Sequence, residues 1–460
     1  MLEFMYIRLP EDIEKLERLG LFDAARSKIN EMLSKNIPSE MRRRLEYELE
    51  RIERLLKDYS ISEEKAIETF KREFPEISVD KFYEWIDKGF IDFILIDGKR
   101  YFFNRFISNL LFTCRDKECL AKKEEAEKKQ EQRRRREALR NHILEILNSN
   151  QEGYIFPRRV RVRMKIKLKP GVVPEGEIVQ CWMPFPRIGD QQTSVRLLSC
   201  FPEKYILAPE NHPQRTIYFE QKVLGDKPIE FKTEFEYTIY AFYKRVNPND
   251  VKPYDEESEL YEKYTREQPP HIIFTRYLRN LAHEIVGDET NPYLKAWKIY
   301  DWLTSNLTYT YVVEYCTYES IAEFVARNLR GDCGFQAILF ITLCRIIGIP
   351  SRWQSGWYAN PVSKGPGPHD WAQFYIEPYG WLFADLSFGR RWKALDPTIH
   401  RFYFGNIDNF RTVLNNDIMV QFYPPKKYLR SDPVDNQRGE LEWKNGNIYY
   451  DKFDYIIEYV

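Results

Sequence analysis

The sequence has few cysteines, no net charge and no long apolar run. Its seven cysteines among 460 residues are odd in number and scattered, so we expect reduced thiols and no disulfide framework. Lys plus Arg number 70 and Asp plus Glu number 70, which leaves no overall field to attract nucleic acid or an anionic membrane. Apolar stretches such as FQAILFITLC reach about half of the roughly 18 residues that a membrane helix needs. The N-terminal segment lacks the pattern of a secretory signal, so we expect a cytoplasmic protein that does not associate with membranes.

The composition and length indicate a globular chain of several domains. Apolar residues make up 43% and charged residues 30%, which excludes a wholly disordered or collagen-like protein. At about 150 residues per domain, 460 residues correspond to roughly three domains. The order of patterns predicts a multidomain α+β protein. We expect a helical module with a β-hairpin (1–115), a charged helix or linker (116–152), an antiparallel β domain (153–248), a mixed α+β region (249–415) and a C-terminal β segment or tail (416–460).

The first hundred residues read mainly as amphipathic helices followed by a hairpin. Asp97-Gly98 separates two β-prone runs, IDFILI and KRYFF, which is a strong hairpin signal. Helix, turn, helix and hairpin is the order of a winged helix-turn-helix. The segment in the place of a recognition helix, VDKFYEWIDKGF, carries Asp80, Glu84 and Asp87, whereas base and phosphate contacts call for Arg, Asn, Gln and Lys. We therefore expect a docking module for a partner protein and no nucleic-acid binding.

Two charge patterns in the middle of the chain need no ligand to explain them. Residues 121–140 carry many charges of both signs and almost no apolar side chains, which predicts a solvated helix or linker. The four arginines Arg133 to Arg136 fit a helix face in water better than a phosphate site. Between 158 and 243 the apolar residues recur at every second position, which predicts an antiparallel β domain, most simply a sandwich.

The most informative segment is RNLRGDCGFQAILFITLCRIIGIPSRW. Asp332 is a good helix N-cap, and Cys333 opens an almost wholly apolar helix that runs through Ile347. A thiol in the first turn of a helix faces unpaired backbone N–H groups and the positive end of the helix dipole. These favour the thiolate and can stabilise an oxyanion on an attacked acyl carbon. The pattern predicts a cysteine nucleophile.

A histidine and a carboxylate suited to assist the thiol follow in PGPHDWAQFYIEPYGWLFADLSFG. His369 begins a strand, and Asp385 lies 16 residues later on the returning strand. A three-residue loop with Glu377 opposite Trp381 would stagger them by four residues. A five-residue loop, with Phe374 opposite Gly380, would set Asp385 directly across from His369. Since Asp385 must hold the imidazole, we predict the longer loop or an equivalent bulge.

These motifs together resemble the transglutaminase-like superfamily of papain-type cysteine enzymes. The resemblance is carried by GDCGFQA, by GIPSR followed by a glycine, by H-x-W, by GW with an Asp four residues beyond Trp381, and by the later FGNIDNFR. It covers about 294–410 and implies a papain-like α+β core in which Cys333 is the nucleophile, His369 the general base and acid, and Asp385 the orienting carboxylate. Gln373 stands where relatives commonly have Glu, and no proline follows Asp385, which leaves the substrate class and the pH behaviour open. Asp396 is a rival for the acidic role.

Other candidate residues carry weaker signals. Tyr309 and Gln336 are candidates for an oxyanion donor or for the lining of the cleft. Cys114 and Cys119 have no second Cys/His pair nearby, so we expect no metal site and no cofactor.

We expect hydrolytic acyl transfer on an amide or peptide bond of a protein or peptide substrate, through a thioester. Crosslinking of the protein-glutamine transglutaminase type is the alternative, and deglycosylation of glycoproteins is a further one by analogy with the family. From a different class, a non-catalytic scaffold that retains the fold stays open.

Overall fold

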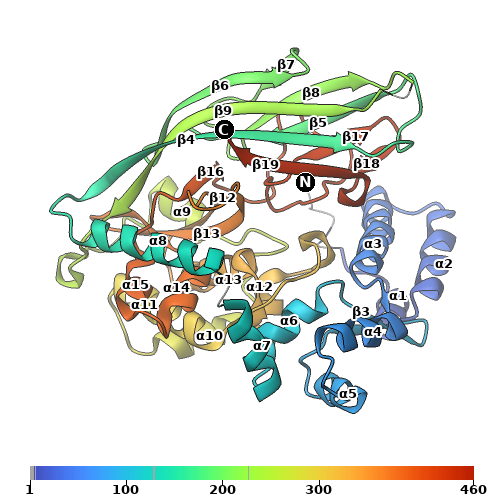
Figure 1. Ribbon diagram of the computed structural model, residues 1–460, viewed down its shortest axis with the longest axis horizontal. Helices are drawn as coiled ribbons and strands as arrows, with labels where there is room; N and C mark the ends of the chain where they lie inside the picture. Colours follow the sequence, from blue (N-terminus) through green and yellow to red (C-terminus); the bar gives the residue numbers. More distant parts are fainter. Residues whose placement is uncertain (1–4, 6, 128–129, 226) are drawn as a thin grey trace.

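The computed structural model describes residues 5, 7–127, 130–225 and 227–460. Figure 1 shows a layer of long strands above a mixed α+β core, with the N-terminal helices beside the core. The chain is a multidomain α+β protein, as the sequence predicts. Two residues of the expected linker, 128 and 129, lie outside the described residues.

The N-terminal module has the order of elements of a winged helix. Strands β1, β3 and β2 form one sheet in that order, and α4 and α5 lie between β1 and β2 in the sequence. The hairpin is confirmed: Ile96 pairs with Lys99, and Asp97 and Gly98 have φ values of 46° and 82°, as the tight turn requires. The elements are α1 (Glu11–Arg18), α2 (Phe22–Leu33), α3 (Ser39–Asp58), β1 (Ile61–Ser62), α4 (Glu63–Glu73), α5 (Val79–Asp87), β2 (Phe93–Ile96), β3 (Lys99–Phe102) and α6 (Phe106–Thr113).

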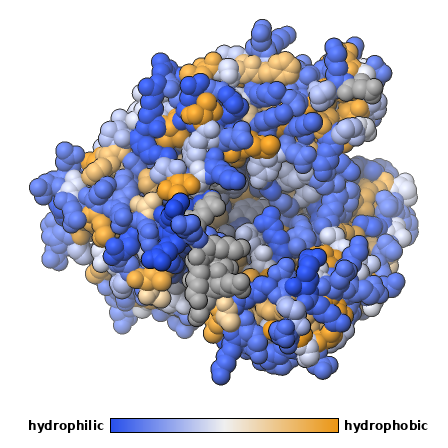
Figure 2. Space-filling model, viewed as in Figure 1, coloured by the Kyte–Doolittle hydropathy of each residue, from blue (hydrophilic) through white to orange (hydrophobic). Residues whose placement is uncertain are grey.

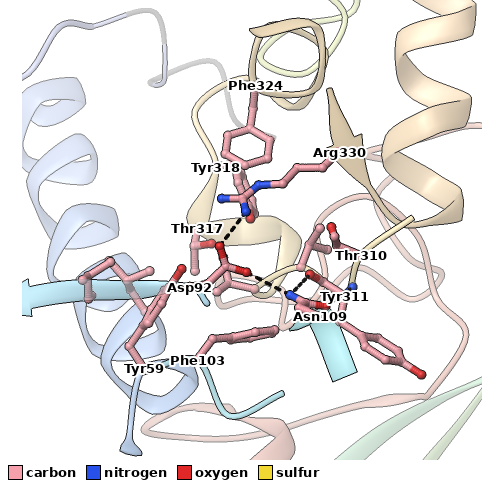
Figure 3. A pocket seen from close by; sticks show the side chains of 14 residues that line it. Tyr59, Asp92, Phe103, Asn109, Thr310, Tyr311, Thr317, Tyr318, Phe324 and Arg330 are labelled. Atoms are coloured by element: carbon pink, nitrogen blue, oxygen red, sulfur yellow. Dashed lines mark hydrogen bonds and ion pairs between the residues drawn. The ribbon is translucent and has the colours of Figure 1, made fainter. Parts of the chain in front are cut away.

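The module is joined to the core by side-chain contacts with the segments on either side of α12. Asn109 accepts a hydrogen bond from the Tyr311 N–H at 2.8 Å and donates to the Tyr311 carbonyl at 3.0 Å. Asp92 forms an ion pair with Arg330 at 2.6 Å, and Figure 3 shows it between Arg330 and Asn109. A cavity of about 180 Å³ lies at this junction. The N-terminal module is therefore built into the core.

Two helices, α7 (Lys117–Glu127) and α8 (Gln130–Leu147), follow the module. The expectation that every cysteine is a free thiol is wrong, because Cys114 and Cys119 form a disulfide with Cα atoms 6.1 Å apart. The short turn between α6 and α7 brings the two side chains together, and a spacing of five residues carried no signal for it. The interpretation of the arginine run as a helix face agrees with the ion pair of Arg133 with Glu137 at 2.9 Å.

The strand layer consists of two antiparallel sheets, with orders β18-β17-β5-β8-β7 and β19-β4-β9-β6. The alternation seen in the sequence holds: Val162, Met164 and Ile166 are fully buried, whereas Arg161 and Arg163 pair with Glu234 outside. The C-terminal segment, which the sequence separated from the β domain, supplies strands to both sheets. The strands are β4 (Gly153–Leu168), β5 (Ile178–Pro184), β6 (Gln192–Phe201), β7 (Tyr205–Leu207), β8 (Thr216–Lys222), β9 (Glu230–Tyr243), β17 (Glu440–Trp443), β18 (Gly446–Ile448) and β19 (Phe453–Tyr459).

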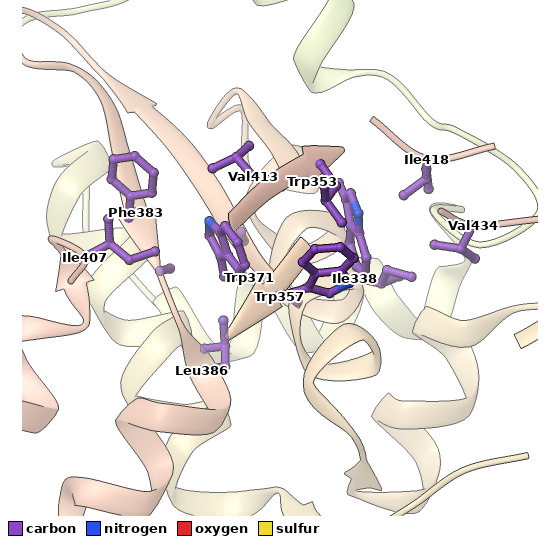
Figure 4. Close-up of a cluster of buried hydrophobic side chains, with 14 of the residues drawn as sticks. Ile338, Trp353, Trp357, Trp371, Phe383, Leu386, Ile407, Val413, Ile418 and Val434 are labelled. Carbon is purple, nitrogen blue, oxygen red and sulfur yellow. The ribbon is translucent and has the colours of Figure 1, made fainter. Parts of the chain in front are cut away.

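The core consists of helices around a five-stranded sheet of order β15-β14-β13-β12-β16. Helix α13 packs on one face of this sheet, where Phe340 meets Phe374 with ring centroids 5.8 Å apart. Figure 4 shows the tryptophans of β12 and β13 and the side chain of Ile338 in this region. The elements are α9 (Glu259–Thr265), α10 (Arg276–Val286), α11 (Pro292–Asn306), β10 (Thr308–Tyr309), α12 (Ile321–Asn328), β11 (Arg330–Gly331), α13 (Cys333–Ile346), β12 (Ser351–Tyr358), β13 (Gly367–Ile376), β14 (Gly380–Ala384), α14 (Leu386–Lys393), α15 (Pro397–Phe402), β15 (Phe404–Gly405) and β16 (Arg411–Asn415), with short 3-10 turns at Pro248–Asp250, Tyr315–Thr317 and Tyr450–Lys452.

Polar and charged side chains cover most of the face seen in Figure 2, and apolar side chains form scattered patches on it. Among the helices that the structure describes, none has both the length and the apolar character needed to cross a bilayer.

Candidate active site

The nucleophile candidate Cys333 is the first residue of α13, as predicted. Asp332 caps the helix and accepts hydrogen bonds from the Phe335 N–H at 3.1 Å and from the Tyr315 hydroxyl at 2.8 Å. Gly334 follows because there is no room for a side chain: a Cβ atom there would collide with the Tyr315 hydroxyl and lie 2.8 Å from Asp370 Oδ2. The first turn of α13 is thus pressed against β13 and against the turn that holds Tyr315.

Cys333 opens into a cavity of about 380 Å³ whose walls come from distant parts of the sequence. The core contributes Tyr309, the segment 311–315, Asp332, Pro368 and Asp370. The N-terminal module contributes Asp58, Phe103, Asn104 and Arg105, and the C-terminal segment contributes Asp432, Asp435, Gln437, Arg438 and Tyr455. Carboxylates outnumber cations among these side chains.

The Cys333 thiol donates a hydrogen bond to Asp370 Oδ2 at 3.2 Å. Gln437 Nε2 donates to the other oxygen of the same carboxylate and to Asp435 Oδ2 at 2.9 Å. Burial, and then the charges of Asp370 and Asp332, raise the pKa of Cys333 well above its ordinary value. The sequence predicted that the helix N-terminus stabilises a thiolate; in the structure the thiol does lie there, but burial and the two carboxyl groups next to the sulfur act against a negative charge.

His369 is held by Asp385 in a buried cluster. His369 Nε2 lies 2.7 Å from Asp385 Oδ2, and Arg411 donates to the same oxygen at 2.7 Å. Arg411 also pairs with Asp408 at 2.7 Å, and the Phe388 ring lies 4.8 Å from the imidazole. Although burial alone would raise the pKa of Asp385, the charges of His369 and Arg411 lower it to about 2. Asp385 is therefore an ionised carboxylate that orients the imidazole.

The hairpin between β13 and β14 differs from both predicted registers. Ile376 pairs with Gly380, so the turn has three residues, 377–379, and Ala372 pairs with Ala384. Continuing this register puts Asp385 opposite Trp371, two residues from the position opposite His369. The predicted longer loop is wrong, because the two side chains meet along the diagonal of the strand pair, a distance within reach of an imidazole.

The structure brings His369 to Asp385 but gives the thiol a different partner. Asp370 pairs with Ser355 and His369 with Gly356, and successive side chains of a strand point to opposite faces. Pro368 and Asp370 line the cavity, and His369 is not among its lining residues. Among the described residues there is no hydrogen bond between Cys333 Sγ and the His369 ring.

The comparison with known families supports the resemblance. Residues 279–386, a range that includes Cys333, His369 and Asp385, match the model of the Transglutaminase-like superfamily. The chain contains a transglutaminase-like domain. An uncharacterized protein of Haemophilus influenzae is 24% identical over 248 residues, which are 47% of this chain and 66% of that protein, just under two thirds of its length.

Two solved structures are similar to the chain. One is a protein of Cytophaga hutchinsonii named as a candidate cysteine protease, with 14% identity, a TM-score of 0.43, and coverage of 66% of this chain and 92% of that one. The other is the periplasmic domain of TgpA from Pseudomonas aeruginosa, with 11% identity, a TM-score of 0.28, and coverage of 55% and 99%. Both TM-scores lie under 0.5, so the assignment of the domain rests on the match of residues 279–386.

Of the three remaining candidates from the sequence, Tyr309, Gln336 and Asp396, only the first lies in the cavity around Cys333. Tyr309 lines the cavity together with Cys333. Gln336 does not: it is buried and donates back to the Gly331 carbonyl at 3.0 Å, so its assignment to the cleft is wrong. Asp396, the rival acid, caps α15 through the Thr398 N–H at 3.1 Å and pairs with Arg140. Asp385 is thus the carboxylate that meets His369.

Sequence reasoning missed Asp370, Gln437 and Arg411. Asp370 could have been found, because it follows His369 directly and strand alternation turns it toward the opposite face. Gln437 lies 68 residues from His369, in a segment with no catalytic motif, and nothing in the sequence points to it. Arg411 lies in the FGNIDNFR stretch, which the sequence singled out only as a family feature.

Proposed function

We propose that the protein is a cysteine-dependent acyl-transfer enzyme that cleaves an amide or peptide bond with Cys333 as the nucleophile. One observation carries the proposal: in a transglutaminase-like domain, the thiol at the N-terminus of a buried helix opens into a cavity of about 380 Å³. A nucleophile in that position faces backbone N–H groups that can stabilise the oxyanion of an attacked carbonyl.

The proposed reaction has two stages. Sγ attacks the carbonyl carbon and its proton passes to His369, which Asp385 holds in one tautomer. The imidazolium then protonates the departing nitrogen as the C–N bond breaks, leaving a thioester on Cys333. Water, deprotonated by His369, attacks the thioester and releases the acid and the thiol. Because His369 and Asp370 point to opposite faces of β13, this reaction requires the imidazole to move to the side of the sulfur in the substrate complex.

Hydrolysis is proposed over crosslinking because water needs no acceptor site of its own. The second candidate is transfer of the acyl group to a primary amine, which the excess of carboxylates in the cavity favours. Protein or peptide substrates are proposed for both reactions.

The test is acyl-enzyme formation with a small activated ester. The expected result is an acetyl group on Cys333, detected by peptide mass spectrometry, that forms in wild type and decays in water. The variant Cys333→Ala should lose it, and His369→Ala should slow both formation and decay. Cys344→Ala is the matched control, because Cys344 is fully buried further along the same helix. Ester turnover that survives in Cys333→Ala would contradict the proposal. Addition of a fluorescent primary amine separates the two reactions. Hydrolysis leaves the amine unchanged, whereas acyl transfer to the amine gives a fluorescent amide product.

A further inference from the structure

The residue next to the predicted base, Asp370, makes the hydrogen bond to the nucleophile. Its Oδ2 atom lies 3.2 Å from Cys333 Sγ and 3.4 Å from the Tyr315 hydroxyl. Asp370 is 6% exposed, so this is a buried contact with little screening by water. A carboxylate that accepts from a thiol stabilises the protonated sulfur and opposes the thiolate.

The position of Asp370 is fixed from three directions. The Ser355–Asp370 pair of β12 and β13 sets the backbone, and Gln437 Nε2 donates to Oδ1. Gln437 also donates to Asp435, whose Oδ2 accepts from the Ser355 hydroxyl. The C-terminal segment thereby ties the carboxylate into a buried network. Asp370 cannot turn away from the sulfur without breaking contacts with that segment.

The charged side chains that the structure describes around Cys333 and Asp370 provide no cation that pairs with Asp370. Within the part of the chain that the structure describes, no Lys, Arg or His forms an ion pair with Asp370. The cations that share the cavity are Arg438, which pairs with Glu314 at 2.7 Å, and Arg105, which stacks on the Tyr311 ring. The other carboxylates that line the cavity are Asp58, Glu314, Asp332, Asp432 and Asp435, and the titratable hydroxyls are Tyr309, Tyr311, Tyr315 and Tyr455. Carboxyl groups therefore outnumber cations around Cys333, and burial raises the pKa of Asp58, Asp332, Asp432 and Asp435.

We propose that Asp370 is a further residue of the reaction, which holds Cys333 as an uncharged thiol in the resting protein until a bound substrate displaces their hydrogen bond. This inference rests on the proposed function. When a carbonyl group enters between Sγ and Asp370, the thiol proton is free to pass to His369 as the S–C bond forms. Asp370 keeps its own protonation state throughout, so no other reactant is needed. Small electrophiles that do not displace this hydrogen bond should therefore react with Cys333 more slowly than with an ordinary thiol.

The protonation states of Asp370 and Cys333 are coupled through their hydrogen bond. Burial, and then the charges of Asp435 and Asp332, raise the pKa of Asp370 well above its ordinary value, and the thiol hydrogen bond acts against that rise. Two acidic groups in contact lose their protons in two steps that belong to the pair, and the second step leaves two negative charges side by side. Asparagine at 370 removes one of these charges while keeping the shape and an acceptor oxygen.

The experiment measures alkylation of Cys333 by iodoacetamide against pH, without substrate, by peptide mass spectrometry. Wild type should show an apparent thiol pKa above the ordinary value of about 8.5. Asp370→Asn should lower that pKa by about 1–3 units, the usual effect of one adjacent charge. Since the thiolate fraction rises tenfold per unit while intrinsic nucleophilicity falls with a Brønsted slope of about 0.45, labelling at pH 7 should become roughly 3- to 40-fold faster.

Two variants separate the charge from a structural effect. Asp370→Glu keeps the charge and should keep the high thiol pKa. Asp435→Asn removes a carboxylate that does not touch Sγ, and should move the thiol pKa by much less than Asp370→Asn. Circular dichroism checks that each variant is folded. The proposal is overturned if wild type labels with an apparent pKa below 8.5, or if Asp370→Asn and Asp435→Asn give the same profile.

The outcome is independent of the test for acyl transfer. A raised thiol pKa that falls in Asp370→Asn, together with no acyl-enzyme in any variant, would reject the proposed function and leave the role of Asp370 in setting the protonation of Cys333. If the acyl-enzyme forms but the thiol pKa is the same in wild type and in Asp370→Asn, the proposed function is supported and the role of Asp370 is rejected.

Discussion

Replacing Arg411 by methionine should destabilise the protein far more than replacing an arginine on its surface. Arg411 is fully buried and pairs with Asp385 and Asp408, each at 2.7 Å and each fully buried as well. Methionine fills most of the space among the rings of Trp371 and Phe388 but leaves two buried carboxylates without their arginine: Asp385 keeps its hydrogen bond with His369, and Asp408 keeps the one from the Tyr403 hydroxyl. Breaking a buried ion pair by removing one partner costs about 3–5 kcal/mol.

The matched control is Arg163→Met on β4. Arg163 pairs with Glu234 at 2.7 Å, but its side chain is 49% exposed. Such a pair contributes about 0–1 kcal/mol. Urea unfolding followed by tryptophan fluorescence compares the two variants with wild type at neutral pH. If Arg411→Met loses no more stability than Arg163→Met, the cluster of Arg411, Asp385 and Asp408 does not stabilise the core and the reasoning fails.

The pH dependence gives the same prediction a second, independent check. The pKa of Asp385 is about 2 in the folded protein, against about 3.9 in an unfolded chain. This difference corresponds to about 2–3 kcal/mol of stability, which is present above pH 4 and is lost as the pH falls through 2. Without Arg411 the pKa of Asp385 rises toward its ordinary value. The difference in stability between wild type and Arg411→Met should therefore narrow between pH 5 and pH 2, and a constant difference would contradict the assignment.

Three further predictions concern packing and covalent structure. Gly334→Ala should cost about 1–3 kcal/mol, because the new Cβ collides with Tyr315 and crowds Asp370, and thermal unfolding would show the loss; Gly367→Ala, where nothing lies within 4 Å, is the control. Asn109→Ala removes both hydrogen bonds to the Tyr311 backbone and should cost about 1–3 kcal/mol, with limited proteolysis showing earlier cleavage between the N-terminal module and the core; unchanged proteolysis would mean that the apolar contacts suffice. Non-reducing peptide mapping should recover Cys114 and Cys119 in one bridged peptide, and free thiols at both positions would refute the disulfide.

The sequence predicted those features that depend on neighbouring residues. Asp332 followed by a long apolar run is a local capping signal, and α13 begins at Cys333 as expected. Asp97-Gly98 predicted the turn between β2 and β3 because its two φ values are set by the residues themselves. The contact between His369 and Asp385 was also predicted, although the register of the strand pair β13–β14 that carries it was predicted wrongly.

The features that escaped prediction depend either on contacts between distant segments or on the shape of a turn. Strands β17 and β19 pair with β5 and β4, which lie more than two hundred residues earlier, and a strand's sequence carries no signal for so distant a partner. The disulfide of Cys114 with Cys119 depends on the turn after α6, which no spacing rule specifies. The register of β13 and β14 depends on the turn 377–379, and any turn of odd length keeps His369 and Asp385 on one face, so alternation could not select among the registers.

The cavity around Cys333 explains why a catalytic motif alone leaves the substrate open. The motif places the sulfur, but Arg105 and Asp58 reach the cavity from the N-terminal module, and Asp435 and Gln437 reach it from the C-terminal segment. Several groups that line the cavity therefore lie outside the transglutaminase-like match of residues 279–386, whereas Asp332 and Asp370, which act on the sulfur directly, lie inside it. Within the match, strand alternation points the neighbouring side chains of β13 in opposite directions. His369 faces Asp385 and the Arg411 that pairs with it, and Asp370 faces the thiol. The family motif names His369 but not Asp370. Strand alternation predicts that Asp370 faces away from His369, but the contact of Gln437 that holds its carboxylate is not visible in the motif.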